Sequence, residues 1–306
     1  MGPLVTVVVI SYNSSRYIFE TLESIKNQTY ENIELIISDD SSTDGTPDIC
    51  KKWLDENQYF FSKAQLLTVE KNTGISANCN RGANAASGEW IKFIAADDIL
   101  LKDCLALNYL FSLKTNCDLI YSNLFFFNKE KEWVSKKYIF EYFNKLNETK
   151  KLKFYCRTAI FLNPPTWFIK NRALKDAGNF DESYRLLEDQ VLILKFLEQK
   201  KNIQYFDEYT IRYRVHGNSI VQAQGHLFID DLIRSYKVIR MKYLKKSNIR
   251  DILYMGNQWI VFKRQMNPHN LFFQFIYLFS PGRYLSLVAR YIPNSKILLP
   301  LKRLII

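Results

Sequence analysis

The chain has 306 residues, enough for one large domain or two small ones with a sizeable core. Its shares of hydrophobic (47%) and charged (24%) residues are those of an ordinary globular protein. The five cysteines are scattered without a Cys-x-x-Cys pair, which argues against a disulfide framework or zinc knuckle and favours a reducing compartment.

The net charge of +11 is concentrated in one part of the chain. Residues 226–306 contain 14 Lys and Arg but only three acids, whereas the first 225 residues contain 28 of each sign. The basic character therefore belongs to the C-terminal segment and needs its own explanation.

Strand-like and helix-like segments alternate in the first third of the chain. The N-terminal apolar run is short and has no basic residues before it, which is typical of a strand rather than a signal peptide. The pattern predicts strands at Val5–Ile10, Glu34–Ser38, Leu66–Val69 and Trp90–Ala95. It predicts a helix capped by Ser14 or Ser15 and running to Asn27, a helix from Pro47 through Trp53, and a small-residue helix, ISANCNRGANAAS, closed by Gly88.

This alternation predicts an α/β fold, with a mixed, mostly parallel sheet and helices on both faces. Ligands of such sheets bind at the carboxyl ends of the strands. Those ends carry Ser11-Tyr12-Asn13, Asp39-Asp40 and Asp97-Asp98, so we expect a ligand site where they meet.

The second half is less regular. In chain order, the pattern predicts a helix at Leu101–Leu113, a strand at Asp118–Phe127, an exposed Lys-rich insertion with its own amphipathic helix at 129–153, a helix opening at Glu188-Asp189, short strands at Ile203–Phe206 and Thr210–Tyr213, and helices from His226 onward.

Two adjacent carboxylates, Asp97 and Asp98, end the strand in WIKFIAADDIL. A single carboxylate at this position would be explained by capping the helix that follows. A pair at this position favours a divalent cation, because Mg²⁺ and Mn²⁺ take hard oxygen ligands and leave positions open for phosphate oxygens. Beside them, Asp40 either caps a loop or accepts a hydrogen bond from a nucleobase, and Tyr12 either packs in the core or stacks on that base.

Two longer stretches resemble glycosyltransferase family 2, whose fold is called GT-A. They are VVVISYNSSRYIFETLESIKNQTYENIELIISDDSSTDGT and NTGISANCNRGANAASGEWIKFIAADD, and the match continues through AGNFDESYRLLEDQVLILKF and YRVHGNSI. Together they cover about residues 4–220 in the expected order, and this order makes the resemblance specific.

The resemblance implies an inverting transfer of a sugar from a nucleotide-sugar donor, expected to be a UDP-sugar, with Mn²⁺ or Mg²⁺. It implies that Tyr12 and Asp40 hold the base, Asp97 the ribose or metal, and Asp98 the metal. The neighbouring Ser11, Asn13 and Asn72 are assigned to the same nucleotide-sugar pocket.

The chain departs from the family pattern at two positions. Ala96 occupies the first position of the usual Asp-x-Asp, so metal binding is expected to depend more on Asp98. Cys79 stands where an Arg is often found, and Arg81 is the candidate to replace its phosphate contact.

Inverting transfer needs a carboxylate that takes the proton of the acceptor hydroxyl. By the resemblance this general base is Asp189, next to Glu188, although acids are also common in the first turn of a helix. His216 either reaches the metal or diphosphate or is hydrogen-bonded in a loop. Trp167, after Pro165, either stacks on the acceptor sugar or is buried.

Residues 226–306 interleave basic and apolar residues, but their apolar runs are too short to span a bilayer. We expect basic amphipathic helices that lie on an anionic membrane surface. The Phe and aliphatic content favours lipid over nucleic acid. A homodimer interface with a solvated basic face is the alternative.

These observations predict a glycosyltransferase domain at 1–225, with a nucleotide-sugar half (1–115) and an acceptor half (116–225), and a helical segment at 226–306. The expected activity is transfer of a hexose or N-acetylhexosamine to a polyprenyl-diphosphate-linked glycan in bacterial O-antigen or capsule synthesis, at the inner face of the plasma membrane. The alternatives are a sugar nucleotidyltransferase and a non-catalytic nucleotide-sugar-binding membrane scaffold.

Overall fold

The computed structural model describes residues 2–134, 138–158, 160, 162–216, 226–238, 240–244, 251–252, 255–256, 259–260, 263–264, 271–272 and 275. Contacts divide the chain into two compact units. The first consists of residues 1–145 and 161–223, and the second of residues 146–160 and 224–306.

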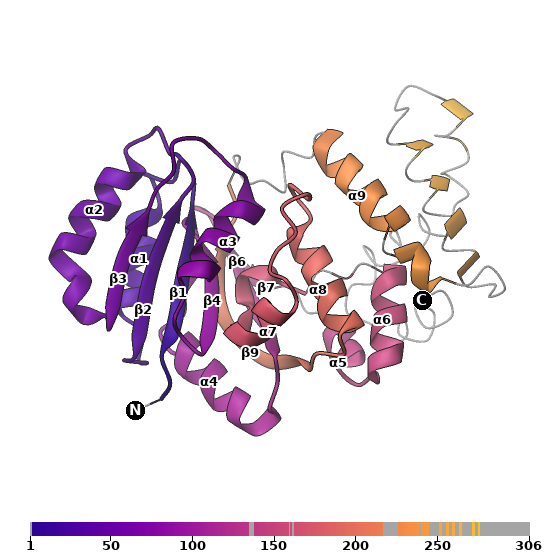
Figure 1. Cartoon of the computed structure of the whole chain (residues 1–306), viewed down its shortest axis with the longest axis horizontal. Helices are drawn as coiled ribbons and strands as arrows, with labels where there is room; N and C mark the ends of the chain where they lie inside the picture. The colour runs from indigo at the N-terminus through magenta and orange to yellow at the C-terminus, as the bar shows by residue number, and fades with distance from the viewer. Residues whose placement is uncertain are drawn as a thin grey trace. The chain divides into compact units, whose positions relative to one another are not determined.

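A nine-stranded sheet is the framework of the first unit (Figure 1). Its strands are β1 (Val5–Ser11), β2 (Ile33–Asp39), β3 (Lys63–Leu67), β4 (Trp90–Ala95), β5 (Ile99–Leu100), β6 (Leu119–Phe127), β7 (Glu132–Val134), β8 (Phe168–Lys170) and β9 (Ile203–Arg214). The strand order is β3-β2-β1-β4-β8-β6-β9-β5, and β7 pairs with β6. The first four strands along the chain are parallel, and β8 joins β4 to β6 by antiparallel pairing.

Helices cover both faces of this sheet. The first unit contains α1 (Ile18–Lys26), α2 (Thr46–Asn57), α3 (Ile75–Ala85), α4 (Cys104–Thr115), α5 (Tyr138–Asn144), α7 (Asn171–Asp176) and α8 (Glu188–Glu198), with short 3-10 turns η1 (Gln58–Phe60) and η2 (Pro164–Thr166). Val5, Val7 and Val9 share a core with buried residues of α1, α2 and α4. Val8, on the opposite face of β1, packs against Gly82 of α3. The predicted α/β sheet with helices on both faces is therefore confirmed.

The start of α1 differs from the prediction that Ser14 or Ser15 caps it. The helix begins at Ile18, and no side chain caps its first turn. The backbone N–H groups of Ser14 and Ser15 instead donate to Thr46, the first residue of α2, and to Asp44, in the loop between β2 and α2. The two serines thus join neighbouring strand-end loops.

Two elements extend beyond their predicted limits. The two short strands expected at Ile203–Phe206 and Thr210–Tyr213 form one continuous strand, β9. Every residue of β6 pairs with a residue of β9, and a bulge near Asn123 shifts the register between the two halves. The Lys-rich insertion contains β7 and α5 before α6 (Glu148–Thr158), which belongs to the second unit.

The second unit contains α6, α9 (His226–Val238) and the short turn η3 (Arg240–Tyr243). Arg157 of α6 forms an ion pair of 2.7 Å with Asp251, and both side chains are mostly buried. Among the described residues, no helix has the length and apolar character needed to cross a membrane. The amphipathic helices expected after residue 275 lie outside the described residues.

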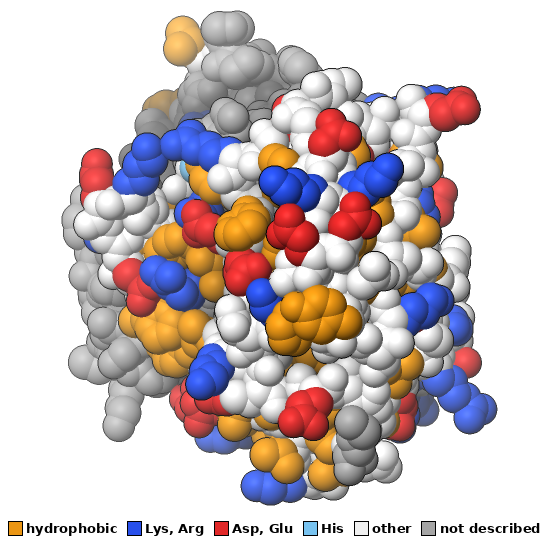
Figure 2. Space-filling view, turned by 90° about the vertical axis from the view of Figure 1, so that its left-hand side faces the viewer, with side chains coloured by type: hydrophobic (Ala, Val, Ile, Leu, Met, Phe, Trp, Pro, Cys, Tyr) orange, Lys and Arg blue, Asp and Glu red, His pale blue; other side chains and the backbone are white. Residues whose placement is uncertain are grey.

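All five cysteines are buried and free of disulfides. On the face shown in Figure 2, acidic and basic side chains are mixed, as the equal numbers of both in the first 225 residues lead us to expect.

Candidate active site

The carboxyl ends of three neighbouring parallel strands meet at one edge of the sheet. Ser11, the last residue of β1, is in register with Asp39 on β2, and Ile10 is in register with Ala95 on β4. Asp97 follows two residues after Ala95. The structure thus brings together the strand ends that the sequence predicts to form a site.

Asp97 and His216 form a partly exposed polar pair at this edge. Asp97 Oδ2 lies 2.8 Å from His216 Nε2, with 28% of the aspartate side chain and 20% of the histidine side chain exposed. The histidine ring also packs on Tyr17, with a centroid distance of 5.1 Å. A side chain from the end of β4 and one from just beyond β9 therefore meet, although 119 residues separate them in sequence.

Asp98 has a different environment from its neighbour. Its side chain is fully buried, and its Oδ1 accepts a hydrogen bond from the backbone N–H of Arg214 at 2.9 Å. Burial, followed by the charge of Asp97, raises the pKa of Asp98 well above its ordinary value. Asp97 thus meets His216, whereas Asp98, the expected metal ligand, is buried next to it.

The pair fits a divalent cation that also contacts a diphosphate. Carboxylate oxygen and imidazole nitrogen are donors that Mn²⁺ accepts. No cluster of three or more His, Cys, Asp or Glu side chains able to hold a metal occurs among the described residues. Cations of this kind commonly use one or two protein carboxylates and take the remaining ligands from phosphate and water.

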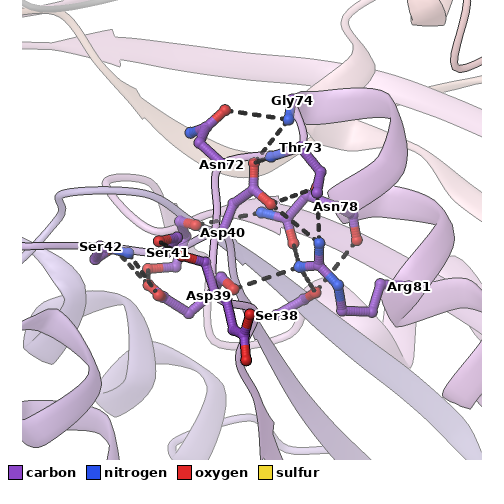
Figure 3. Close-up of polar contacts among 12 residues, drawn as sticks. Ser38, Asp39, Asp40, Ser41, Ser42, Asn72, Thr73, Gly74, Asn78 and Arg81 are labelled. Atoms are coloured by element: carbon purple, nitrogen blue, oxygen red, sulfur yellow. Dashed lines mark hydrogen bonds and ion pairs between the residues drawn. The ribbon is translucent and has the colours of Figure 1, made fainter.

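Asp40 and Arg81 form the polar cluster drawn in Figure 3. Asp40 accepts hydrogen bonds from the backbone N–H groups of Thr73 and Gly74 and lies 3.0 Å from Arg81 Nη2. Burial raises the pKa of Asp40, but the hydrogen bonds from Thr73, Arg81 and Gly74 outweigh burial, so that the pKa lies below its ordinary value. This carboxylate thus fixes the loop before α3.

Arg81 is engaged with the protein through both of its terminal nitrogens. Nη1 donates to Asn78 Oδ1 at 2.9 Å and to Ser38 and Asp39 at 3.3 Å, and Nη2 donates to Thr73 and Asp40. The arginine expected to contact phosphate therefore joins the end of β2 to α3.

The remaining nucleotide-pocket candidates divide into exposed and internally bonded residues. Tyr12 is 51% exposed, so its ring does not pack in the core. Asn13, in a left-handed conformation (φ 48°), accepts from the backbone N–H of Thr43, and Asn72 accepts from that of Gly74. Ser11 is buried and donates to Asp39 at 3.0 Å.

Glu188 and Asp189 are the first two residues of α8. Asp189 Oδ1 accepts the backbone N–H of Gln190 at 2.6 Å. Burial, and then the charge of Glu188, raises the pKa of the Cys79 thiol on α3. Ser76 of α3 also donates to the carbonyl of Tyr184 in the segment before α8. The same helix therefore borders the Asp40 cluster and the start of α8.

The two acceptor-pocket candidates are internal. Trp167 is 3% exposed, and its indole N–H donates to the carbonyl of Leu162 at 2.8 Å, so its ring offers no face to a sugar. The stacking role expected for Trp167 is therefore wrong. The carbonyl of Pro165 accepts a 2.6 Å hydrogen bond from the ammonium of Lys92, which is fully buried on β4.

The sequence patterns missed Lys92 and Arg214. Arg214 packs between Tyr17 and Phe127 and donates to the carbonyl of Asp97. Its position two residues before His216, in YRVHGN, is the signal that could have identified it. Lys92, in the apolar run WIKFIA, is the one charged residue of that strand.

Comparison with known proteins relates the chain to glycosyltransferases, as its sequence motifs lead us to expect. The family model described as glycosyl transferase family 2 matches residues 6–178. The Streptococcus pneumoniae glycosyltransferase GlyA is 31% identical over 75% of this chain, and the Bacillus subtilis minor teichoic acid biosynthesis protein GgaB is 31% identical over 71% of it. The chain covers 33% of GlyA and 24% of GgaB, so it corresponds to only part of either relative.

Two solved structures share the fold. Staphylococcus aureus TarS 1–349 in complex with UDP-GlcNAc has a TM-score of 0.63 and 19% identity, covering 92% of this chain and 80% of that one. The Pyrobaculum calidifontis mannosyltransferase PcManGT, in complex with GDP-Man and Mn²⁺, has a TM-score of 0.57 and 19% identity, covering 77% of this chain and 64% of that one. The expected GT-A fold is confirmed.

Proposed function

The chain belongs to glycosyltransferase family 2, and from this premise we propose that it transfers a hexose or N-acetylhexosamine from a UDP-sugar to a glycan with inversion at the anomeric carbon. The observation that carries the proposal is the Asp97–His216 pair, which lies at the strand-end edge where α/β sheets bind ligands. The complex of TarS with UDP-GlcNAc supports UDP as the nucleotide.

In this proposal Asp97 and His216 hold Mn²⁺ or Mg²⁺, and the exposed ring of Tyr12 stacks on the base. When bound, the cation neutralises the negative charge that develops on the leaving diphosphate. The PcManGT complex with GDP-Man and Mn²⁺ supports this choice of cofactor. Asp98 is buried next to Asp97 and accepts the backbone N–H of Arg214, and we propose that it supports the pair through this hydrogen bond.

Asp189 is the proposed general base. It takes the proton of the acceptor hydroxyl as the acceptor oxygen forms its bond to the anomeric carbon. The bond between that carbon and the phosphate oxygen breaks in the same displacement, and UDP leaves with the electron pair. Glu188 lies beside Asp189 at the start of α8 and supports its placement.

The proposed acceptor is a polyprenyl-diphosphate-linked glycan of the bacterial surface. GgaB, a teichoic acid biosynthesis protein, and GlyA support a cell-surface polymer. We further propose that residues 1–225 form the catalytic domain, and that the basic segment 226–306 holds it at the inner face of the plasma membrane.

Replacing Asp189 with Asn tests the proposed reaction. The substitution keeps the side-chain size but removes the base, so glycosyl transfer should fall by roughly 10²–10⁴-fold while UDP binding is retained. The exposed Glu198, at the other end of α8, provides the control variant Glu198→Gln. Turnover that stays unchanged in a folded Asp189→Asn protein would refute the base assignment, whereas a wild-type chain that binds UDP without any turnover would favour a non-catalytic binding role.

A further inference from the structure

Arg214 is hydrogen-bonded to the two aspartates at the end of β4, one of which, Asp97, belongs to the Asp97–His216 pair. Its Nε donates to the backbone carbonyl of Asp97 at 2.8 Å, and its own backbone N–H donates to Asp98 Oδ1 at 2.9 Å. His216 follows two residues later on the same chain segment. One residue therefore ties the end of β4 to the end of β9.

The guanidinium of Arg214 is itself held on three sides. It lies 4.5 Å from the ring centroids of both Tyr17 and Phe127, and its Nη2 lies 2.7 Å from Glu20 Oε2. Only 13% of the side chain is exposed. We call Arg214 together with Tyr17, Glu20 and Phe127 the Arg214 clamp.

The clamp also reaches the histidine side of the pair. The ring of Tyr17 contacts the imidazole of His216 at a centroid distance of 5.1 Å while its π system faces the guanidinium. Tyr17 precedes α1, so the clamp joins the loop after β1 to the ends of β4 and β9. A shift of Arg214 would thus move the carbonyl of Asp97 and the support of His216 together.

We propose that Arg214 is a positioning residue that sets the distance between Asp97 and His216 and thereby the affinity of the site for its divalent cation. The inference rests on the proposed function. A guanidinium is suited to this role because its planar fork donates in two directions while both of its faces pack on aromatic rings. A lysine ammonium keeps the charge but cannot make these contacts at once.

The direct test is Mn²⁺ binding by the full chain in the presence of UDP, measured from the loss of the free Mn²⁺ resonance in electron paramagnetic spectra. We expect Arg214→Lys to weaken Mn²⁺ binding by roughly 10- to 100-fold, as is typical when a residue that orients a metal ligand is replaced. The folded fraction is measured in parallel by near-ultraviolet circular dichroism, because a purely structural role would lower that fraction but not the Mn²⁺ affinity of the folded molecules.

Arg212 offers a closely matched control. It lies on the same strand, sits over the same Phe127 ring at 4.4 Å and pairs with Glu132 at 2.7 Å. Unlike Arg214, it has no hydrogen bond to Asp97 among the described contacts. Arg212→Lys should therefore leave Mn²⁺ binding within about twofold of wild type, and an equal loss in both variants would overturn the proposal.

Tyr17→Leu keeps the test decisive should Arg214→Lys fail to fold. It removes the ring that supports both the guanidinium and the imidazole, and it should weaken Mn²⁺ binding by roughly three- to tenfold. Wild-type affinity in folded Arg214→Lys or in Tyr17→Leu would overturn the positioning role alone. A wild-type chain that binds no Mn²⁺ would instead overturn the proposed cation site, and this inference with it.

Discussion

At the scale of single residues, Lys92 is the least expected feature of the sheet. Its ammonium is fully buried and donates to the carbonyls of Pro165 (2.6 Å) and Trp167 (3.2 Å). Burial lowers the pKa of Lys92 to about 8. The strand therefore contains a lysine that fixes the backbone of η2 and also carries a desolvation cost when charged.

This lowered pKa predicts how stability depends on pH. Below pH 8 Lys92 is protonated in both folded and unfolded chains, so the cost of burying its charge is fully present. Between pH 8 and 10.5 only the unfolded chain keeps the proton, so the folded state gains up to about 1.4 kcal/mol per pH unit. The free energy of unfolding of wild type minus that of Lys92→Met should rise over this range, as measured by urea denaturation.

Lys52→Met, at an exposed position on α2, is the control for this experiment. The difference between wild type and this control should show no comparable rise. Parallel pH curves for wild type and Lys92→Met would contradict the burial of a charged amine at this position.

Residue types identified the site edge, but individual roles depended on the three-dimensional structure. The sequence located Asp97, Asp98 and His216, because acids after a strand and a histidine in YRVHGN are local patterns. The resemblance gave the two carboxylates different roles, but the sequence could not show that the turn after β4 buries Asp98 and leaves Asp97 partly exposed. The burial of Trp167 could not be predicted from the local sequence either, because it depends on strands that are distant in sequence.

At the scale of elements, α3 is the helix that connects the strand-end edge to the segment before α8. Its small residues allow close packing on β1. A Cβ atom added to Gly82 would lie 2.2 Å from Val8 Cγ1, well inside van der Waals contact.

Gly82→Ala should therefore destabilise the protein although Ala is the better helix former by about 1 kcal/mol. Overpacking against β1 is expected to cost about 1–3 kcal/mol and to exceed that gain. The matched control is Gly256→Ala, also in a helical segment, where an added Cβ meets no atom of the described residues within 4 Å. Thermal denaturation should show a lower midpoint for Gly82→Ala and no decrease for Gly256→Ala. A higher midpoint for Gly82→Ala would contradict the close packing.

The elements themselves were largely predictable because the first four strands and their helices have strong periodic patterns. The predicted ISANCNRGANAAS helix, for example, corresponds to α3 at Ile75–Ala85. Non-local pairing accounts for the differences. The continuous β9 exists because β6 pairs with both halves of it, and the start of α1 follows from hydrogen bonds with Asp44 and with Thr46 at the start of α2.

At the scale of the whole molecule, the basic C-terminal segment is the main prediction that lies mostly outside the described residues. Replacing Arg290, Lys296, Lys302 and Arg303 with Gln should weaken binding to anionic liposomes by roughly 1,000-fold, since each charge near such a surface contributes about 1 kcal/mol. Cosedimentation with phosphatidylserine vesicles measures this effect.

The same number of charges can be removed from the first unit as a control. Lys51, Lys52, Lys129 and Lys131 are exposed there, and replacing them with Gln should change liposome binding much less. Equal losses in the two variants would show that net charge alone, rather than the C-terminal segment, governs membrane binding.

The grouping of α6 with the C-terminal residues could not be read from the sequence, because it depends on contacts such as the ion pair between Arg157 and Asp251. The division of charge, in contrast, is a property of the sequence alone. The proposed domain boundary near residue 225 follows from the charge distribution of the sequence, and it stays a prediction.

The measurement that tests the account most directly is a calorimetric titration of UDP into the full chain, with Mn²⁺ and again with excess EDTA. We predict binding that requires Mn²⁺ and that falls about tenfold or more in Asp97→Asn, since even residues that only orient metal ligands have effects of that size. Asp103→Asn, which changes another acid near the start of α4, should bind as wild type does. UDP binding that is equally tight in EDTA, or unchanged in Asp97→Asn, would contradict a cation site built on Asp97 and His216.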